Sequence, residues 1–583
     1  MRIWVLFLCF IFICANYTLA QVDLDQIVVT KYGQGKNLPI NSESSIFKNL
    51  ENINLDLQSR APFKDIQADF SLRGSTFEGT GVVFEGISVN DPQTGHFHAD
   101  LPFTTQDLQS FEKSSLVNGQ FYPQALAGAV NFEIKKPQKD SGVITSGLGR
   151  YNLVSEALSI TKRYSDFGSR LSLETQQTDG YRLATDFRKF VGRIDNSLDL
   201  PSAEIKFGAG YLEKEFGAYD FYTPGKGYPS QEWTKTWLVN SSADIDGDGF
   251  NFYPAFLWRR HDDKFLLDKT LLRSNYLNHH RTDIYSPQFL TGQKVSWGEW
   301  KAGVEAREEV MSSSNLGKHT RNAKSALVNS KIDSLGRFTL EDSLRFDRYS
   351  SFGEVVNGSA TLSYNLDAKK KIYAGFARSF RPPSFTELYY NDPTTLGDAL
   401  LGAEKANTYE AGFKLSDKRI SLNFCGYVRQ EKNLIDWVKR TSSQAKWQAE
   451  NISSSLVSGA ETDLALNINS KTKLGLRYAY ANKRFDDQGY LFKYGPNYTR
   501  HLAGANFHKE IDNFTYAASL TYKKKPGRDG WVIADVSTDY LLKKNPDLKL
   551  YFAVSNIFNV EYQEIEGVPQ PGIWPEAGLR LEW

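Results

Sequence analysis

The feature that most constrains the fold is the alternation of apolar and polar residues over the last eight positions, 576–583. Four apolar residues share one face of a strand, opposite a glycine and two charged residues: Ala577, Leu579, Leu581 and Trp583 against Gly578, Arg580 and Glu582. Such a strand can turn one face to lipid and the other to a polar lumen. A half-buried strand of a soluble sheet alternates in the same way, so the rest of the chain must decide.

Alternating runs about ten residues long recur from about residue 140 onward, which is the length a tilted strand needs to cross a bilayer. After residue 20 there is no long apolar run, and the mean hydropathy is −0.45, which excludes helical spans. About 445 residues in units of about 20 give about 22 strands. The prediction is an all-β membrane protein with an antiparallel barrel over residues 139–583. Long polar stretches such as 318–351 are expected to be extracellular loops.

The N-terminus has the features of a secretory signal over residues 1–20. Arg2 precedes an apolar run from Ile3 to Ala15, and Ala20 ends a small-residue cleavage site. This run is too short to span a bilayer, because a helix needs about 20 residues. Two of the three cysteines lie inside the signal, so only Cys425 remains and no internal disulfide can form.

Residues 35–138 show a compact-domain pattern of short runs joined by glycine-rich turns. A barrel of about 22 strands is wide enough to need a plug. We therefore expect a mixed α/β plug domain ahead of the barrel. Aromatic residues are 14% of the chain, which suits the water–lipid boundary, and the net charge of +1 gives no reason to expect nucleic acid as a partner.

Several motifs, in order along the mature chain, resemble those of TonB-dependent outer-membrane receptors of the cobalamin and siderophore type. The segment after the signal resembles the TonB box, a short β-prone stretch suited to adding a strand to a partner's sheet. The motifs are Asp25-Gln26-Ile27-Val28-Val29-Thr30, Leu72-Arg73-Gly74, 82–91, 127–132, Phe380-Arg381-Pro382-Pro383 and 556–562. Asn118 departs from the family, which usually has an arginine before Gly119. Residues 21–34 are then the box and linker.

The resemblance implies energised import without covalent catalysis, so no enzyme activity and no cofactor are expected. A scarce solute binds at the outer face, and the inner-membrane TonB complex, driven by the proton gradient, pulls on the plug through the box. By analogy with the family, Arg73 of the plug is expected to pair with Glu410 or Glu461 of the barrel. The alternative is that both glutamates line a wet lumen.

The plug loop richest in polar groups is the expected floor of the solute site. Its candidate contacts are Asn90, Asp91, Gln93, His96, Phe97 and His98. His96 and His98 have the chemistry of metal ligands, but two histidines in a loop more often form hydrogen bonds. Contact with the solute is therefore the favoured role.

A second candidate metal site is the acidic segment Asp244, Asp246 and Asp248. Its spacing is that of a calcium loop, but Ala255 stands where an EF-hand has glutamate, which excludes an EF-hand. A looser structural calcium site in an extracellular loop and a solvated acidic turn both stay open. The family's cobalamin receptors use loop calcium, and 178–187 resembles their early loop.

Cobalamin or a related corrinoid is the predicted solute, with a ferric siderophore as the alternative. The resemblance disfavours haem as the solute, because the family's haem receptors carry a histidine after the Phe-Arg-Pro-Pro motif and residues 384–404 contain none. A passive porin or adhesin would lack a plug and a box, and an outer-membrane enzyme would need a Ser/His/acid set that spacing does not assign.

Overall fold

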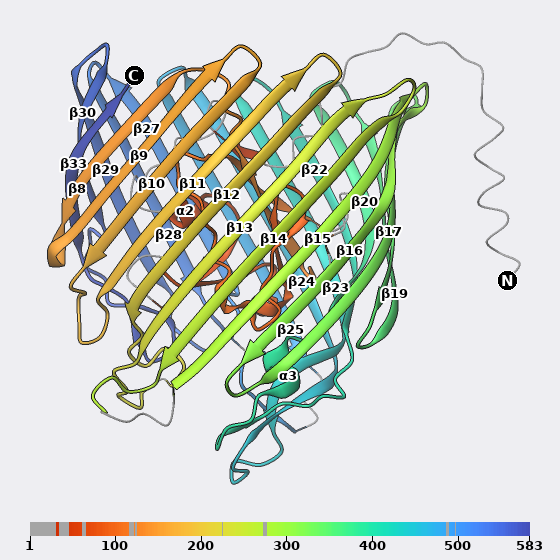
Figure 1. The fold of residues 1–583 in the computed structure, drawn as a ribbon, viewed down its shortest axis with the longest axis vertical. Coiled ribbons are helices and arrows are strands. Elements are labelled where there is room, and N and C mark those ends of the chain that lie inside the picture. The colour runs from red at the N-terminus through yellow and green to blue at the C-terminus, as the bar shows by residue number, and fades with distance from the viewer. Residues whose placement is uncertain are drawn as a thin grey trace, which may run out of the picture.

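The computed structural model describes residues 31–33, 46–60, 66–115, 122, 125–223, 225–271, 277–485, 489–495 and 497–583. These residues form a closed antiparallel barrel of 22 long strands with a smaller domain inside it (Figure 1). The barrel is the predicted one. Among the described residues, no helix is both long enough and apolar enough to cross a membrane.

The barrel begins at Ser141 and ends next to the C-terminus. Its long strands are β8 (Ser141–Gly149), β9 (Leu153–Tyr164), β10 (Phe167–Thr178), β11 (Phe187–Leu200), β12 (Ala203–Gly217), β13 (Gln231–Asp246), β14 (Asn251–Leu266), β15 (Leu277–Val295), β16 (Gly298–Ser313), β17 (Gly317–Leu335), β18 (Phe338–Tyr349), β19 (Gly353–Asn365), β20 (Lys370–Arg381), β22 (Glu404–Ser416), β23 (Ile420–Lys439), β24 (Trp447–Asn469), β25 (Thr472–Phe485), β27 (His501–Ile511), β28 (Phe514–Lys524), β29 (Trp531–Lys543), β30 (Asp547–Ser555) and β33 (Trp574–Glu582). Short pieces lie at the loop end: β21 (Thr395–Leu396), β26 (Leu491–Phe492), β31 (Gln563–Ile565), β32 (Val568–Pro569), 3-10 helix η5 (Arg150–Asn152) and α3 (Phe385–Tyr389).

The C-terminal strand closes the barrel by pairing with the first one. β33 and β8 are antiparallel, with Gly578 opposite Gly147, and the backbone of Trp583 exchanges two hydrogen bonds with Gly142. Leu579 and Trp583 are about half exposed on the outer face. Closure leaves no open sheet edge, so the backbone groups can be satisfied within lipid.

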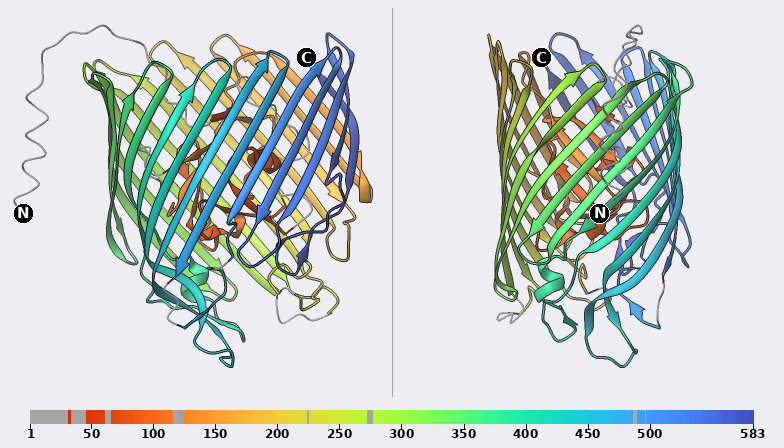
Figure 2. Two further views of the ribbon diagram at one scale, coloured as in Figure 1. Left: turned by 180° about the vertical axis from the view of Figure 1, so that it is seen from behind. Right: turned by 90° about the vertical axis from the view of Figure 1, so that its right-hand side faces the viewer.

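The two ends of the barrel differ. At one end the strands are joined by tight turns such as 201–202 and 296–297, and the C-terminus lies there; the other end carries long segments such as 382–403 and 556–573. Figures 1 and 2 show α3 among these long loops and the C-terminus at the opposite end. Residues 318–351 do not form the predicted loop but most of β17 and β18. Charged residues on the luminal face of these strands, such as Arg321 and Arg345, obscure the alternation of apolar and polar residues in the sequence.

The domain in the lumen is built on a five-stranded sheet in the order β1-β6-β7-β4-β5. Its elements are β1 (Lys31–Gly33), α2 (Ile46–Asn49), η2 (Leu50–Asn52), β2 (Asp56–Ser59), β3 (Ala68–Ser71), η3 (Phe77–Gly79), β4 (Thr80–Phe84), β5 (Ile87–Ser88), η4 (Gly95–Phe97), β6 (Leu108–Ser114) and β7 (Gly128–Ile134). An apolar core that includes Phe70, Phe84 and Phe132 holds it together. Figure 2 shows this plug inside the barrel.

Barrel closure should be sensitive to bulk at Gly142, because a Cβ there would lie 2.1 Å from the ring of Trp583. We expect Gly142→Ala to cost about 1–3 kcal/mol of overpacking. The readout is the fraction of protein that migrates as a heat-modifiable, folded barrel. Gly426→Ala is the matched control, because its added Cβ would meet only a carbonyl oxygen at 3.9 Å. Equal folded fractions for the two variants would contradict the expectation.

Candidate functional site

An inner anchor joins the plug to the barrel wall at Arg73, which follows β3. The Nη1 atom of Arg73 lies 2.6 Å from Oε2 of Glu410 on β22, and Nη2 lies 2.8 Å from Oε2 of Glu461 on β24. The guanidinium also lies over the ring of Tyr427, 4.5 Å from its centroid. The charged groups of Arg73, Glu410 and Glu461 are buried, and out of water a charge pair is strong and an unpaired charge is costly.

The backbone at Arg73 is itself unusual. Its φ is +51°, and the next residue, Gly74, has φ +70°. For a residue with a Cβ this conformation costs about 1 kcal/mol or more. The contacts of the guanidinium hold the strained turn in place, together with a hydrogen bond from Arg429 to the carbonyl oxygen of Arg73 at 3.1 Å.

Lys113 completes the inner anchor. Its Nζ lies 2.9 Å from Oε1 of Glu461, while Glu410 accepts further hydrogen bonds from Ser115 at 2.8 Å and Tyr373 at 2.7 Å. The two positive charges of Arg73 and Lys113 therefore balance the two negative charges of Glu410 and Glu461. The sequence motifs did not indicate Lys113, because the family's usual cation stands just before the glycine that corresponds to Gly119. The available signal was a lysine on the plug strand that ends shortly before that glycine.

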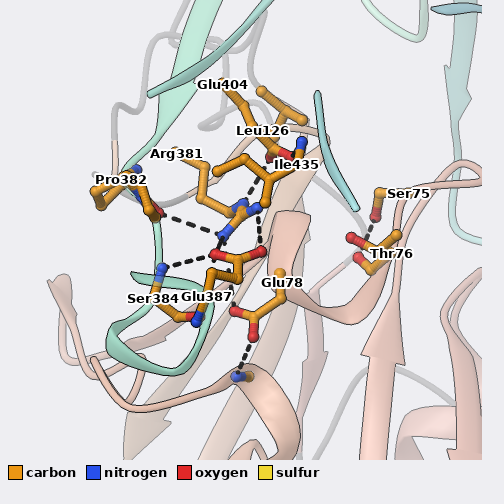
Figure 3. Close-up of polar contacts among 12 residues, drawn as sticks. Ser75, Thr76, Glu78, Leu126, Arg381, Pro382, Ser384, Glu387, Glu404 and Ile435 are labelled. Carbon is orange, nitrogen blue, oxygen red and sulfur yellow. Dashed lines mark hydrogen bonds and ion pairs between the residues drawn. The ribbon is translucent and has the colours of Figure 1, made fainter. Parts of the chain in front are cut away.

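An outer anchor surrounds Arg381 at the end of β20, where three carboxyl groups converge on one guanidinium (Figure 3). Arg381 donates to both carboxylate oxygens of Glu387 at 2.8 and 2.9 Å, and its Nε donates to Glu404 at 2.6 Å. Glu78 of the plug is the third, with Oε2 3.9 Å from Nη1 of Arg381. Burial and the charge of Glu387 raise the pKa of Glu78 to about 8. The protonated form of Glu78 is therefore favoured more than that of an exposed glutamate.

Helix α3 fixes an extracellular loop to the plug. Ser384 and Glu387 form a capping box, in which each side chain accepts a hydrogen bond from the backbone N–H of the other. The first two N–H groups of the helix donate to the carbonyl oxygens of Pro92 and Gln93 of the plug, at 2.8 and 3.0 Å. The Phe-Arg-Pro-Pro segment thus positions both the cation and the helix of the outer anchor.

The plug residues next to the loop that carries α3 form a buried polar network. Asp69 pairs with Arg60 at 2.8 Å and with Nδ1 of His96 at 2.9 Å. These partners overcome the effect of burial and hold the pKa of Asp69 at about 2. His98 accepts a hydrogen bond from the backbone N–H of Phe70 at 3.0 Å, and burial lowers its pKa to about 3.

Comparison with known proteins now decides the family. A model described as TonB dependent receptor-like, beta-barrel, matches residues 125–557, which is more than half of the chain. The chain belongs to the TonB-dependent receptor family. It is therefore a receptor of the outer membrane that works with TonB in transporting a small solute, and not an enzyme.

The proteins that this TonB-dependent receptor resembles are named for different solutes. The vitamin B12 transporter BtuB of Photobacterium profundum is 20% identical over 525 residues, covering 84% of this chain and 82% of BtuB. The siderophore receptor PirA of Pseudomonas aeruginosa has a TM-score of 0.72 at 15% identity, covering 93% of this chain and 96% of PirA. The copper transporter OprC has a TM-score of 0.78 at 14% identity, covering 95% and 99%. The two structural likenesses show the fold alone.

The structure of this receptor places all six predicted solute contacts inside the protein. None is more than 9% exposed: Asn90, Asp91, Gln93, His96, Phe97 and His98. Asn90 accepts from the backbone N–H of Val82 at 2.7 Å, and Asp91 accepts from Arg259 at 2.6 Å. Their role as solute contacts stays a prediction. The TonB box, Asp25 to Thr30, lies outside the described residues.

The acidic segment predicted to bind calcium does not lie in an extracellular loop. Asp244 and Asp246 end β13 and Asp248 stands in the turn before β14, at the end where the tight turns and the C-terminus lie. The expected location is wrong because β13 runs away from the long loops. Among the residues that the structure describes, no three His, Cys, Asp or Glu side chains are grouped to hold a metal ion. Calcium binding by this turn stays a prediction.

Removing Arg73 should release the inner anchor. We expect Arg73→Ala to weaken plug docking by about 3–5 kcal/mol, because Glu410 and Glu461 stay buried without their shared cation. The urea concentration at which the purified receptor opens a conductance in a planar bilayer measures this. Arg73→Gly, which suits the positive φ, should lower that threshold as well, whereas Arg440→Ala, which removes an exposed pair, should not. A normal threshold in Arg73→Gly would mean that the backbone, not the charge, holds the plug.

His98 should make plug docking sensitive to acid. The docked imidazole has a pKa of about 3 and the released one about 6.5, so only the released plug takes up a proton between these values. Docking should therefore weaken as pH falls from 6.5 toward 3. The urea threshold for conductance, measured across this range, should fall less in His98→Gln than in the wild type. His319→Gln, at the outer rim, should keep the full acid sensitivity; an equal loss in all three proteins would exclude His98 as the cause.

Proposed function

We propose that this receptor imports cobalamin or a related corrinoid, with a ferric siderophore as the alternative. The observation that carries this choice is the charge around the outward plug loop. In the part of the chain that the structure describes, the buried arginines that contact the loop are already bound by carboxylates: Arg60 by Asp69, Arg259 by Asp91 and Arg307 by Glu309. A ferric catecholate carries several negative charges and needs free cations, whereas cyanocobalamin has no net charge. The similarity to BtuB favours the same choice.

Aromatic side chains at the loop end support a large, partly apolar solute. A cluster around Phe385 and Trp437 buries their apolar faces, and Tyr389, Tyr390, Trp447 and Tyr494 pack against it only partly buried. Tyrosine and tryptophan offer an apolar ring and a polar tip, which suits a solute with amide groups around a ring. This surface fits a corrinoid and also a siderophore, so it supports the size of the solute and not its identity.

The sheet order supports energy transfer from the TonB box to the inner anchor. β1 follows the box in the sequence and pairs with β6, with Lys31 opposite Glu112. The next residue of β6 is Lys113, which binds Glu461. A pull on the box is therefore delivered, through backbone hydrogen bonds, to the strand that carries one of the two anchor cations. We propose that this strand is the first part of the plug to respond.

Uptake of radiolabelled cyanocobalamin by a strain that lacks its own receptor and expresses this chain tests the proposal. We expect accumulation that is lost in Ile27→Pro, which cannot add a regular strand to TonB, and lost when the proton gradient is collapsed. Excess unlabelled cyanocobalamin should compete, and a ferric siderophore should not. No uptake by a correctly inserted barrel would remove cobalamin, and competition by a ferric siderophore would favour the alternative.

A further inference from the structure

Two buried carboxyl groups of the barrel wall lie against each other at the outer part of the lumen. Glu232 on β13 and Asp263 on β14 are 1% and 3% exposed, and both side chains face the lumen from adjacent strands. Thr234 is paired with Asp263 in the register of the two strands, which sets Glu232 and Asp263 diagonally on the luminal face. Two carboxylates placed in this way out of water repel each other, so a single proton held by the pair would stabilise the arrangement.

The charged groups around the pair leave it without a cation of its own. Lys214 on β12 binds Asp100 at 2.5 Å, Arg259 on β14 binds Asp91 at 2.6 Å, and Arg60 of the plug binds Asp69 at 2.8 Å. The other titratable groups that face this region are His96 and His98 of the plug, His261 on β14, His280 on β15 and Tyr222 of segment 218–230. Each of these cations therefore already has a carboxylate partner. The charge of the Glu232–Asp263 pair can instead be reduced by a bound proton.

Hydrogen bonds connect one member of the pair to an extracellular loop and the other to the plug. The hydroxyl of Tyr222, in loop 218–230, donates to Glu232 with both oxygens at 3.1 Å, and it accepts from Gln67 of the plug at 2.5 Å. On the other side, Gln93 of the plug donates to Asp263 at 3.5 Å. Both connections end on the plug, and the first passes through the loop.

Unpartnered polar atoms mark the same place. Oδ1 of Asp263, Oε1 of Gln93, Oε1 of Gln67 and Oδ2 of Asp100 are buried acceptors with no hydrogen-bond donor. Buried acceptors of this kind are costly unless a proton or a water reaches them. The site therefore has more hydrogen-bond acceptors than donors. Loss of a shared proton would remove one more donor.

We propose that Glu232 and Asp263 share one proton, and that this proton positions loop 218–230 against the plug. The inference rests on transport by this receptor but not on the identity of its solute. When the proton is lost at alkaline pH, two like charges face each other out of water, the pair separates, and Tyr222 and Gln93 lose their common link. Loop 218–230 is then released from the plug while the inner anchor at Arg73, which has no shared proton, stays closed.

A spin label on the loop tests this without any solute. The full chain carries Lys226→Cys as the labelling site, which is exposed, and Cys425→Ser to remove the buried thiol. Label mobility is followed from pH 5 to 10 in reconstituted receptor. We expect an immobile loop at neutral pH and a several-fold rise in mobility at alkaline pH. Because solute is absent, a failed search for the transported compound leaves this result unaffected.

Matched variants assign the transition to the pair. Glu232→Gln replaces the shared proton with an amide that donates to Asp263 and still accepts from Tyr222, so the loop should stay immobile throughout. Glu232→Ala should be mobile at every pH, with folding checked by heat modifiability. Glu78→Gln, at the outer anchor, should keep the wild-type transition. The proposal is overturned if Glu232→Gln follows the wild-type curve, if the wild-type loop stays immobile to pH 10, or if EDTA frees it at pH 7, which would indicate a metal ion.

Discussion

The structure depends on one constraint: a closed sheet in lipid turns its entire polar face inward, where the charges must find partners. Burying a charge costs several kcal/mol unless it is paired. Four of the largest fully buried side chains are therefore luminal arginines held by carboxylates or by the plug: Arg170, Arg193, Arg259 and Arg429. Arg170 shows the principle, because it binds Asp195 of the barrel and Asp107 of the plug at once. The plug thus supplies some of the partners that neutralise the charged side chains of the barrel lumen.

Much of this pairing follows a rule that can be read from the sequence. Residues two apart on a strand share a face, so an arginine and an acid at that spacing can reach each other. In the described part of the chain, five barrel strands carry such a pair on the luminal face: Arg193–Asp195, Arg307–Glu309, Arg345–Asp347, Arg429–Glu431 and Arg580–Glu582. The spacing therefore predicts which charges are satisfied within the wall. Charges without such a neighbour, such as Glu410 and Glu461, are the ones that the plug must satisfy.

The sequence predicted the barrel because alternation is a local property, repeated in strand after strand. It failed at 318–351, where charges on the luminal face outweigh the apolar residues, and it misplaced Asp244 to Asp248, because the direction of a strand depends on counting every strand before it. The pairing of Arg73 was expected only through the family resemblance, since 337 residues separate it from Glu410. The contact of Lys113 with Glu461 forms only when the plug lies in the barrel, and the approach of Glu232 to Asp263 depends on the register of β13 and β14, which residue spacing alone does not give.

The two anchors of the plug differ in charge balance, and the difference gives them different roles. At the inner anchor, two cations meet two carboxylates, so its ion pairs need no proton. On the outer side, Glu78, Glu387 and Glu404 share the cation of Arg381, and the cations beside the Glu232–Asp263 pair are bound by other carboxylates, so bound protons favour these contacts. The outer contacts can then loosen, through pH or a solute that displaces them, while the inner one holds. The inner anchor is joined through β6 to the strand that follows the TonB box. A receptor built in this way can respond to events at its outer surface and still keep its lumen closed until force arrives from the other side.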